Sequence, residues 1–282
     1  MATALVEALE LRDGAAMPRL GLGTWRMGES RAKRADELAA LRLGLDLGMN
    51  LIDTAEMYGE GGAEEIVGEA IRGRRDDVFV VSKFYPYHAA RAPLARACEA
   101  SLKRLAIDCM DLYLLHWMSS VPFEETVEAL EKLVAQGKIR RWGVSNLDVE
   151  ELEALVAVGG GERVASNQVL YSLTQRGIEY DLLPWCAKRR VPVMAYSPLD
   201  QGAIASNAGL RAVAKRLSVE PAQVALAWAL RESNVIAIPK ATRPEHVRAN
   251  RGAADLHLDP ESLAALDKAF PAPRRKTPLA MA

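Results

Sequence analysis

The sequence has few cysteines, and their spacing offers neither a metal site nor a disulfide framework. Its three cysteines, Cys98, Cys109 and Cys186, are far apart and include no C-x-x-C pair. Zinc sites and disulfide-rich secreted domains both need paired, closely spaced cysteines, so neither is expected here. Free thiols are typical of a reducing compartment, and we therefore predict a cytoplasmic protein.

Long hydrophobic segments are missing as well. The N-terminal stretch MATALVEALELRDG has no basic segment followed by an apolar core, so it does not resemble a secretory signal. The longest clean apolar run covers residues 224–230. A membrane-spanning helix needs roughly 20 apolar residues, so we expect no association with a membrane.

Neither sign of charge is in excess. Lysine and arginine total 36, aspartate and glutamate total 37, and the net charge is −1. Nucleic-acid binding depends on a basic surface that neutralises phosphates, so no nucleic-acid partner is expected. With 50% hydrophobic and 26% charged residues, the composition is that of a soluble globular protein. Nothing in the surface pattern requires an oligomer, and a monomer is expected.

What the sequence does contain is a strand-like run followed by a helical pattern, repeated eight times. The runs are continuous apolar segments, as expected for parallel strands that are covered on both faces. Because no compositional break interrupts the repeat, residues 1–282 are predicted to form a single domain, an α/β fold of the (β/α)8 TIM barrel type. The predicted strands are 19–22, 50–52, 78–82, 111–115, 141–144, 166–169, 191–195 and 235–238.

Further elements are predicted around the eight units. Residues 9–18 suggest an N-terminal β-hairpin that turns at Asp13 and Gly14. Residues 35–47 carry an amphipathic leucine pattern, and Asp148 precedes an acid by three residues, as in a helix capping box. Asp259 followed by proline opens an extra C-terminal helix. The tail 271–282 is proline-rich and basic, and we expect it to be loosely ordered.

The main alternative for an α/β chain is the open, doubly wound sheet. Its dinucleotide-binding signature is G-x-G-x-x-G between the first strand and the first helix. The nearest match begins at Gly21 and Gly23, but Arg26 stands where the third glycine belongs. The closed barrel is therefore favoured.

Four reactive side chains follow neighbouring predicted strands. Asp53 and Tyr58 come after the second strand, Lys83 after the third and His116 after the fourth. Taken singly, each has an ordinary interpretation, as a helix cap, a surface tyrosine, a solvated lysine or a rim histidine. In a (β/α)8 barrel, however, the carboxyl ends of the strands meet at one mouth, where catalytic residues collect.

The chemistry of these four residues is mutually consistent. A phenol has a pKa of about 10, and a neighbouring ammonium such as Lys83 is expected to lower the pKa of Tyr58. Asp53 would keep Lys83 protonated, and His116 could donate a second hydrogen bond to the substrate. No serine or cysteine nucleophile accompanies them, and the four histidines at 88, 116, 246 and 257 lack metal-binding spacing. A proton donor without a nucleophile indicates carbonyl reduction with hydride from a cofactor.

At this point the sequence resembles the aldo-keto reductase family. The resemblance implies that Asp53, Tyr58, Lys83 and His116 form the catalytic tetrad of that family. Residues 53–58 and the segment GIEYDLLPWC (177–186) are closest to bacterial members that reduce methylglyoxal with NADPH. The six motifs that carry the resemblance are LGLGTW (20–25), DTAEMYG (53–59), VSK (81–83), DLYLLH (111–116), GKIRRWGVSN (137–146) and IPK (238–240).

The resemblance also implies an extended NADP(H) across the mouth of the barrel. Ser145, Asn146 and Gln168 match positions that hydrogen-bond the nicotinamide carboxamide, and Tyr196 matches the residue that stacks on the ring. The segment after Tyr196 resembles the one that lies over the pyrophosphate. The full set of cofactor residues implied is Gly23, Thr24, Trp25, Asp53, Ser145, Asn146, Gln168, Tyr196, Ser197, Pro198, Leu199, Ile238, Pro239, Lys240, Ala241, Thr242, His246 and Asn250.

Cofactor choice depends on the segment after the eighth strand. Lys240 and Thr242 precede a helix that starts at proline, and such groups suit a 2′-phosphate. Asn250 matches the position that contacts adenine. Many relatives carry an arginine where this chain has His246, and Arg243 could compensate. NADPH is expected over NADH, with the ratio left open.

Two tryptophans are expected to form the substrate pocket. Trp25 and Trp117 flank the proposed tetrad, and the carbonyl oxygen is expected between Tyr58 and His116. The loop 117–122 is short, which favours a shallow pocket for small aldehydes and 2-oxoaldehydes such as methylglyoxal. Loops of this length also admit larger aromatic aldehydes.

Two other functions remain as alternatives. Some relatives in the family keep the tetrad yet serve as cofactor-binding, channel-associated subunits, but those carry interaction segments outside the barrel, which are almost lacking here. A metal-dependent barrel hydrolase would need clustered histidine and aspartate ligands at several strand ends. Only His116 occupies such a position, so no metal is predicted.

Overall fold

In the computed structural model, which describes residues 5–281, eight parallel strands form one sheet. The strands follow one another in the sheet in the same order as in the sequence. The sheet closes where the main chain of Gly21 donates to Ala237 at 2.9 Å and that of Gly23 to Pro239 at 3.0 Å. This is the (β/α)8 barrel that the sequence predicts. The strands are β3 (Leu22–Gly23), β4 (Leu51–Asp53), β5 (Phe79–Phe84), β6 (Leu112–Leu115), β7 (Trp142–Ser145), β8 (Asn167–Leu170), β9 (Val193–Tyr196) and β10 (Val235–Ala237).

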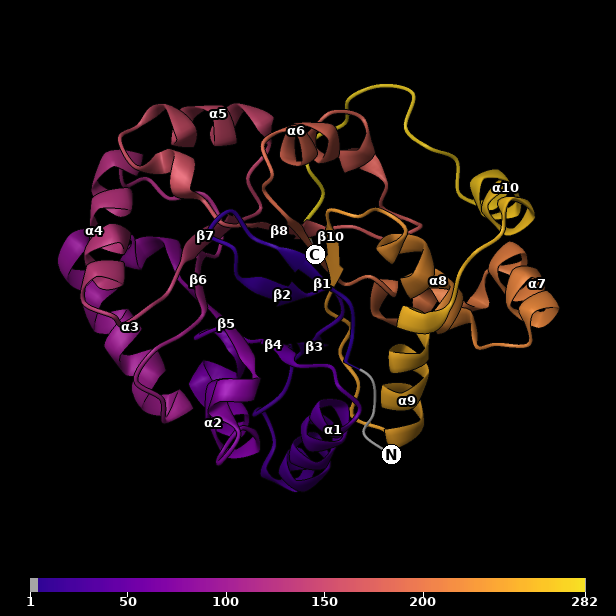
Figure 1. The fold of residues 1–282 in the computed structure, drawn as a ribbon, viewed down its shortest axis with the longest axis horizontal. Coiled ribbons are helices and arrows are strands. Elements are labelled where there is room, and N and C mark those ends of the chain that lie inside the picture. Colours follow the sequence, from indigo (N-terminus) through magenta and orange to yellow (C-terminus); the bar gives the residue numbers. More distant parts are fainter. Residues whose placement is uncertain (1–4, 282) are drawn as a thin grey trace.

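Helices surround this sheet on its outside (Figure 1). The predicted capping box of Asp148 is present at the start of α5, and Asp259 caps the start of α10, as expected. Among residues 5–281, no helix combines the length and the apolar character needed to cross a membrane. The helices are α1 (Arg34–Asp46), α2 (Gly62–Ala70), α3 (Arg91–Leu105), α4 (Phe123–Ala135), α5 (Val149–Ala157), α6 (Leu182–Lys188), α7 (Ala208–Leu217), α8 (Pro221–Leu230), α9 (Pro244–Gly252) and α10 (Pro260–Ala269).

Side chains alternate between two apolar layers. Leu51, Val81 and Leu114 belong to a cluster inside the barrel, whereas Ile52 and Val80, their neighbours along the strands, belong to the layer between sheet and helices. This alternation follows from the two-residue period of a strand. Both faces of the strands are therefore buried, which explains the continuous apolar runs in the sequence.

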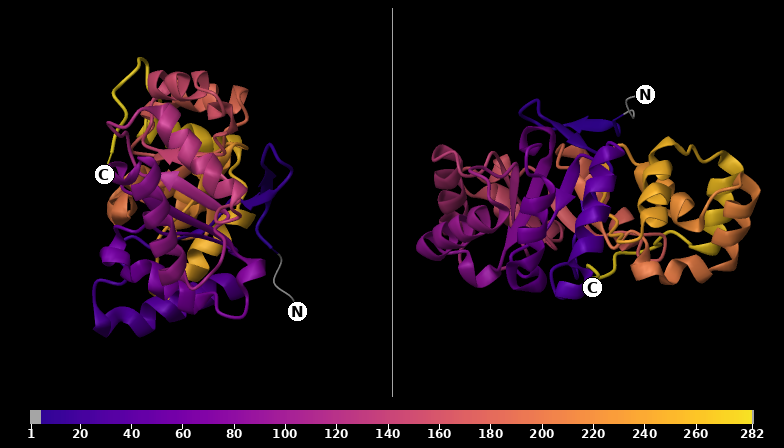
Figure 2. Two further views of the ribbon diagram at one scale, coloured as in Figure 1. Left: turned by 90° about the vertical axis from the view of Figure 1, so that its left-hand side faces the viewer. Right: turned by 90° about the horizontal axis from the view of Figure 1, so that it is seen from below.

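The predicted N-terminal hairpin closes one end of the barrel. Its strands β1 (Ala8–Glu10) and β2 (Ala16–Pro18) pair antiparallel, and Leu11 and Met17 pack onto the cluster inside the barrel. Figure 2 shows the hairpin and the C-terminus on opposite faces of the molecule. The other end of the barrel, where the strands have their carboxyl ends, is thus left for the proposed site.

Several predicted strand ends were one to two residues too early. The sequence pattern ends where polar side chains begin, yet Asp53, Lys83 and Ser145 all lie within the hydrogen-bonded strands. Their main-chain groups still pair with neighbouring strands. A polar side chain that points into the barrel does not interrupt the hydrogen bonds between the main chains. The predicted first strand was displaced instead: only Leu22 of residues 19–22 belongs to β3.

The C-terminal tail is irregular but not loose, and here the sequence-based expectation was wrong for residues 271–281. Lys276 forms ion pairs with Asp148 at 3.2 Å and with Asp181 at 3.0 Å. Leu279 packs against the buried core. These contacts tie the tail to two loops that lie far from it in sequence. Residues 1–4 and Ala282, which the predicted N-terminal stretch and tail include, lie outside the described residues.

Gly28 allows the loop after β3 to contact the start of α2. Its φ is +78°, and a Cβ there would lie 2.3 Å from the carbonyl carbon of Gly62. We expect Gly28→Ala to lower the free energy of unfolding by about 1–3 kcal/mol more than Gly14→Ala. Gly14 is the matched control, because its φ is +83° and nothing lies within 4 Å of its Cβ position. Urea unfolding of both variants measures the difference, and equal losses would contradict the steric account.

Candidate active site

Strand geometry directs the predicted tetrad into the barrel mouth. Asp53 lies two residues after the inward-facing Leu51 in β4, and Lys83 lies two residues after the inward-facing Val81 in β5. The same spacing in the neighbouring strand directs His116, the residue after β6, to the same side. Because inward-facing residues recur every two positions, the last inward residues of adjacent strands meet at the mouth.

A buried ion pair forms the centre of this group. Lys83 Nζ lies 2.8 Å from Asp53 Oδ2, and both side chains are almost completely buried. The ammonium also donates to the Thr54 carbonyl at 2.8 Å and to the Tyr58 oxygen at 3.2 Å. Burial alone would lower the pKa of Lys83, but the negative charge of Asp53 and the hydrogen bonds to Asp53 and Tyr58 outweigh it, so the pKa is raised. All three donors of the ammonium are therefore used, and the charge is retained.

Asp53 is the ionised partner. Burial raises the pKa of Asp53 above its usual value, although Lys83 and a hydrogen bond from Gln168 act in the opposite direction. Gln168 Nε2 donates to Asp53 Oδ1 at 2.7 Å, and Lys83 donates to the other oxygen. Since both carboxylate oxygens accept hydrogen bonds from amide or ammonium donors, the carboxylate form fits these contacts.

For Tyr58 the sequence-based expectation of a lowered pKa was wrong. Burial raises the pKa of the Tyr58 phenol; Lys83 lowers it, but the nearby negative charge of Asp53 raises it again. The net direction is upward, so the phenol stays protonated at neutral pH. Lys83 donates to the phenol oxygen, and the hydroxyl hydrogen is left to point elsewhere.

His116 is a neutral member of the group. Its ring meets the Tyr58 ring edge-on at 5.9 Å. Burial and the positive charge of Lys83 lower the pKa of His116 to about 2. Its Nδ1 is buried without a hydrogen-bond partner among residues 5–281. A neutral imidazole can still donate one hydrogen bond to an oxygen, which is the role the sequence suggested.

The polar residues predicted for the nicotinamide form a connected cluster beside the ion pair. Tyr196 donates to Asn146 Oδ1 at 3.0 Å, and Asn146 Nδ2 donates to the His116 carbonyl at 3.1 Å. Ser145 Oγ donates to the Gln168 carbonyl at 2.8 Å. The structure therefore brings these four predicted residues together with the tetrad.

The predicted phosphate residues lie at the edge of the mouth next to β3. A Cβ on Gly23 would lie 2.7 Å from the Ile238 carbonyl oxygen, so glycine permits this close approach. The helix that was expected to start at Pro244 does so. Burial lowers the pKa of Lys240, and the cations Lys33 and Arg26 lower it further.

Other predicted cofactor residues surround this edge. Arg243 contacts both His246 and Glu245, so the arginine proposed to compensate for His246 lies directly beside it. Asn250 is buried in α9. Ser197 has a φ of +46°, and the loop that it begins continues into a short 3-10 segment, Asp200–Ser206. The remaining predicted positions, Thr24, Pro198, Leu199, Pro239, Ala241 and Thr242, lie in the loops after β3, β9 and β10.

Sequence reasoning named Trp25 and Trp117 at the mouth but missed Tyr85. Trp117 packs against His116 at 4.9 Å, as a pocket wall would, and Tyr85 meets Trp117 edge-on at 6.0 Å. Tyr85 follows Lys83 by two residues, so the rule that found Lys83 could have found Tyr85 as well. Trp25, 37% exposed, carries the Arg26 guanidinium 4.5 Å above its ring.

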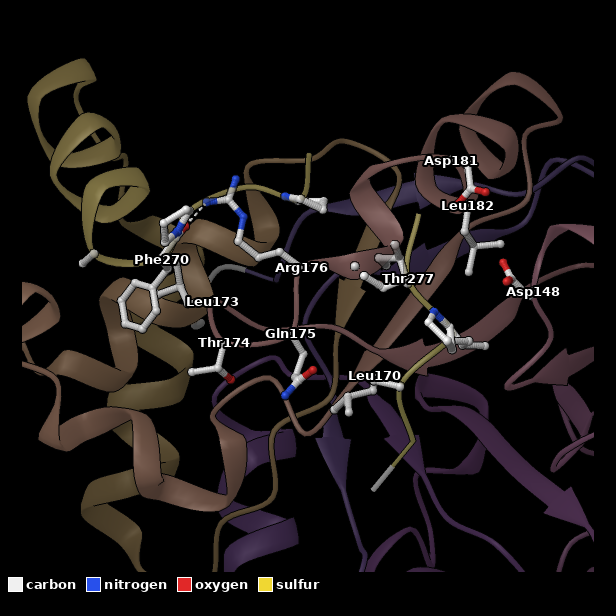
Figure 3. A pocket seen from close by; sticks show the side chains of 18 residues that line it. Asp148, Leu170, Leu173, Thr174, Gln175, Arg176, Asp181, Leu182, Phe270 and Thr277 are labelled. Atoms are coloured by element: carbon white, nitrogen blue, oxygen red, sulfur yellow. Dashed lines mark hydrogen bonds between the residues drawn. The ribbon is translucent and has the colours of Figure 1, made fainter. Parts of the chain in front are cut away.

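A separate cavity of about 600 Å³ lies under the C-terminal tail. Figure 3 shows Arg176 and Phe270 on one side of it and Asp148 and Asp181 on the other. Arg176 donates to the Phe270 carbonyl at 2.5 Å. None of the residues predicted for catalysis or cofactor binding lines this cavity.

Over residues 5–281, no group of three or more histidine, cysteine, aspartate or glutamate side chains could hold a metal ion.

Comparisons with known proteins agree with one another. The profile of the Aldo/keto reductase family matches residues 19–270. Methylglyoxal reductase YeaE of Escherichia coli (strain K12) is 52% identical over 278 residues, covering 97% of this chain and 98% of that protein. Glyoxal reductase of Bacillus subtilis (strain 168) is 33% identical, covering 95% of this chain and 94% of that protein. A crystal structure of an aldo/keto reductase from Klebsiella pneumoniae, in complex with NADP and acetate, has a TM-score of 0.96 and 53% identity, covering 99% of this chain and 100% of that chain.

The depressed pKa of His116 predicts an acid-sensitive stability. At pH values between the folded-state pKa of about 2 and the usual histidine pKa, His116 carries a proton in the unfolded chain but not in the folded chain. Stability should therefore fall as the pH falls below about 6.5, with a contribution approaching about 1.4 kcal/mol per pH unit. We expect His116→Asn to remove this contribution and flatten the profile. Urea unfolding from pH 7 to 4.5 measures it, and parallel profiles for the two proteins would refute the prediction.

Proposed function

The chain belongs to the aldo/keto reductase family and is an NADP-dependent oxidoreductase, and we propose that Tyr58, Lys83, Asp53 and His116 catalyse its reduction of carbonyl groups to alcohols. The observation that carries this assignment is the contact between the buried, charged Lys83 and the Tyr58 oxygen at 3.2 Å. A protonated phenol beside a buried ammonium is suited to give a proton to an oxygen that becomes negative.

The residues at the mouth suit NADP(H). Asn146 and Gln168 offer the amide donors and acceptors that a carboxamide needs, and Lys240 provides positive charge beside the N-terminus of α9 for a phosphate. When bound, NADPH supplies the hydride for the reaction.

The proton is the part of the chemistry that the chain itself provides. Tyr58 would donate its hydroxyl hydrogen to the carbonyl oxygen, while Lys83 stabilises the phenolate left behind through the hydrogen bond that it already makes. His116, neutral because of its depressed pKa, would orient the same oxygen without competing as an acid. Asp53 keeps Lys83 charged throughout.

The substrates proposed are small aldehydes and 2-oxoaldehydes such as methylglyoxal. The relatives named methylglyoxal reductase and glyoxal reductase support this choice, together with the short loop after His116. Trp25 and Trp117 would form the apolar walls of the pocket. The alternative of a regulatory, channel-associated subunit receives no support from these relatives.

The proposal extends to the state of the protein in the cell. One catalytic domain over residues 1–282, acting as a cytoplasmic monomer without a nucleic-acid partner, remains the expectation. The three cysteines are unpaired, and Cys98 and Cys186 are buried, which suits a reducing compartment.

Removing the phenol hydroxyl tests the proton donor. Tyr58→Phe should reduce turnover of methylglyoxal and 4-nitrobenzaldehyde by about 10²- to 10⁴-fold, because only the general acid is lost. Affinity for NADPH, measured by titration calorimetry, should stay nearly unchanged and serves as the control for folding. Normal turnover in this variant would refute the assignment of Tyr58.

Removing the charge at position 240 tests cofactor choice. Lys240→Ala should weaken NADPH binding by about tenfold, because a charge-assisted contact to the 2′-phosphate is lost. NADH lacks that phosphate, so its affinity should change little. Dissociation constants of both cofactors for both proteins decide the matter, and equal losses would show that Lys240 does not contact the 2′-phosphate.

A further inference from the structure

A row of aromatic rings runs from the proposed proton donor to the surface. Tyr58 meets His116 at 5.9 Å between ring centroids, and His116 meets Trp117 at 4.9 Å. Trp117 meets Tyr85 at 6.0 Å, and Tyr85 stacks on Tyr87 at 4.7 Å with the ring planes 19° apart. Each of these separations lies in the range typical of interacting aromatic pairs.

From His116 outward, the exposure of the rings increases. His116 is 9% exposed, Trp117 and Tyr85 are partly exposed, and Tyr87 is 66% exposed. Tyr85 covers part of Tyr87 by stacking, but most of the Tyr87 ring faces solvent. A single exposed aromatic ring is common on protein surfaces, so exposure alone assigns Tyr87 no role. Its connection through Tyr85 to Trp117, beside His116, is the observation that does.

A buried carboxylate holds the outer end of the row. Glu56 Oε1 accepts the main-chain N–H of Tyr85 at 2.6 Å and lies 2.9 Å from His88 Nδ1. Glu56 is 9% exposed, and its own N–H donates to the Lys83 carbonyl at 3.1 Å. The carboxylate thereby links the loop that carries Tyr58 to the segment that carries Tyr87.

The opposite side of this segment is attached as well. Tyr87 lies in the 3-10 turn Pro86–His88, and Ser119 Oγ donates to the Pro86 carbonyl at 2.8 Å. Ser119 belongs to the loop that also carries Trp117. The turn is thus hydrogen-bonded to loops on both sides, which limits the entropy lost when a ligand packs on the Tyr87 ring.

We propose that Tyr87, held in place by Glu56 and His88, is an outer substrate contact that favours aldehydes with an aryl ring on a short linker. The carbonyl end of such a substrate lies at Tyr58 and His116, while the aryl ring packs on Trp117, Tyr85 and Tyr87. The inference rests on the proposed function, because it places the reacting carbon at Tyr58. Glu56 and His88 act only by positioning the ring.

Two aldehydes that differ only in the aryl group test this contact. Propanal and 3-phenylpropanal have carbonyl groups of nearly equal reactivity, because two methylene groups separate the ring from the reacting carbon. We expect the wild-type chain to favour 3-phenylpropanal in kcat/KM. Tyr87→Ala should lower the ratio of the two kcat/KM values by about two- to tenfold, the usual worth of an aromatic pair.

The control variant is Tyr180→Ala. Tyr180 is also well exposed, at 52%, and makes no ring contact with the row among the described residues. This substitution removes an equally large surface ring and should leave the ratio at its wild-type value. A similar fall in both variants would show that the Tyr87 effect is not specific and would overturn the inference.

The positioning role has its own readout. His88→Ala removes the side-chain partner of Glu56 and should raise the KM for 3-phenylpropanal more than that for propanal, with the loss in KM rather than kcat. His88→Asn places an amide donor near the original Nδ1 position and should restore most of the ratio. If both His88 variants keep the wild-type ratio, the positioning role is refuted.

The outcomes separate the two proposals. If the wild-type chain reduces both aldehydes and Tyr87→Ala leaves their ratio unchanged, the outer contact is wrong and the reductase assignment stands. If the wild-type chain oxidises NADPH with neither propanal nor methylglyoxal, the proposed function itself fails, and the inference fails with it.

Discussion

The proposed site depends on the buried ion pair between Lys83 and Asp53. Removing two charges from water costs several kcal/mol for each ion, and a single contact at 2.8 Å rarely recovers all of that. Further hydrogen bonds offset part of this cost. Gln168 donates to the second carboxylate oxygen of Asp53, and the Thr54 carbonyl accepts a hydrogen bond from the Lys83 ammonium. The pair therefore contributes little to stability by itself. Its value lies in keeping a permanent positive charge at a defined point in an apolar barrel.

That charge governs the behaviour of Tyr58. Burial and Asp53 hold the phenol protonated, whereas Lys83 favours its ionised form. The opposing influences suit an acid that must keep its proton until negative charge develops on the substrate. The direction of the lysine hydrogen bond also matters, since it occupies a lone pair of the phenol oxygen and stabilises the phenolate as it forms. The sequence revealed the partners but not which influence prevails, because burial of the hydroxyl depends on the packing around it.

The predictable parts of this protein are those that follow from local pattern. Eight apolar runs predicted the barrel, and strand ends predicted where Asp53, Lys83 and His116 meet. The tail was mispredicted because the ion pairs of Lys276 join residues more than 90 positions apart in sequence, for which composition gives no signal. The contact of Glu56 with the turn at Tyr85 was missed for a similar reason. It joins the loops after β4 and β5, which lie side by side because these two strands pair.

Residues in the left-handed backbone conformation include both glycines and residues with side chains. At the closed end, the hairpin turn takes a positive φ at Gly14, where the absence of a side chain makes it inexpensive. At the mouth, Asn146 has a φ of +58° and Ser197 a φ of +46°, directly after β7 and β9. Such residues cost more there than glycine would, although asparagine tolerates the conformation better than most. For Asn146 the reason is visible in the structure, since its amide connects Tyr196 to the His116 carbonyl and glycine would remove that link. Local strain at the mouth thus accompanies a polar side chain that the proposed cofactor site requires.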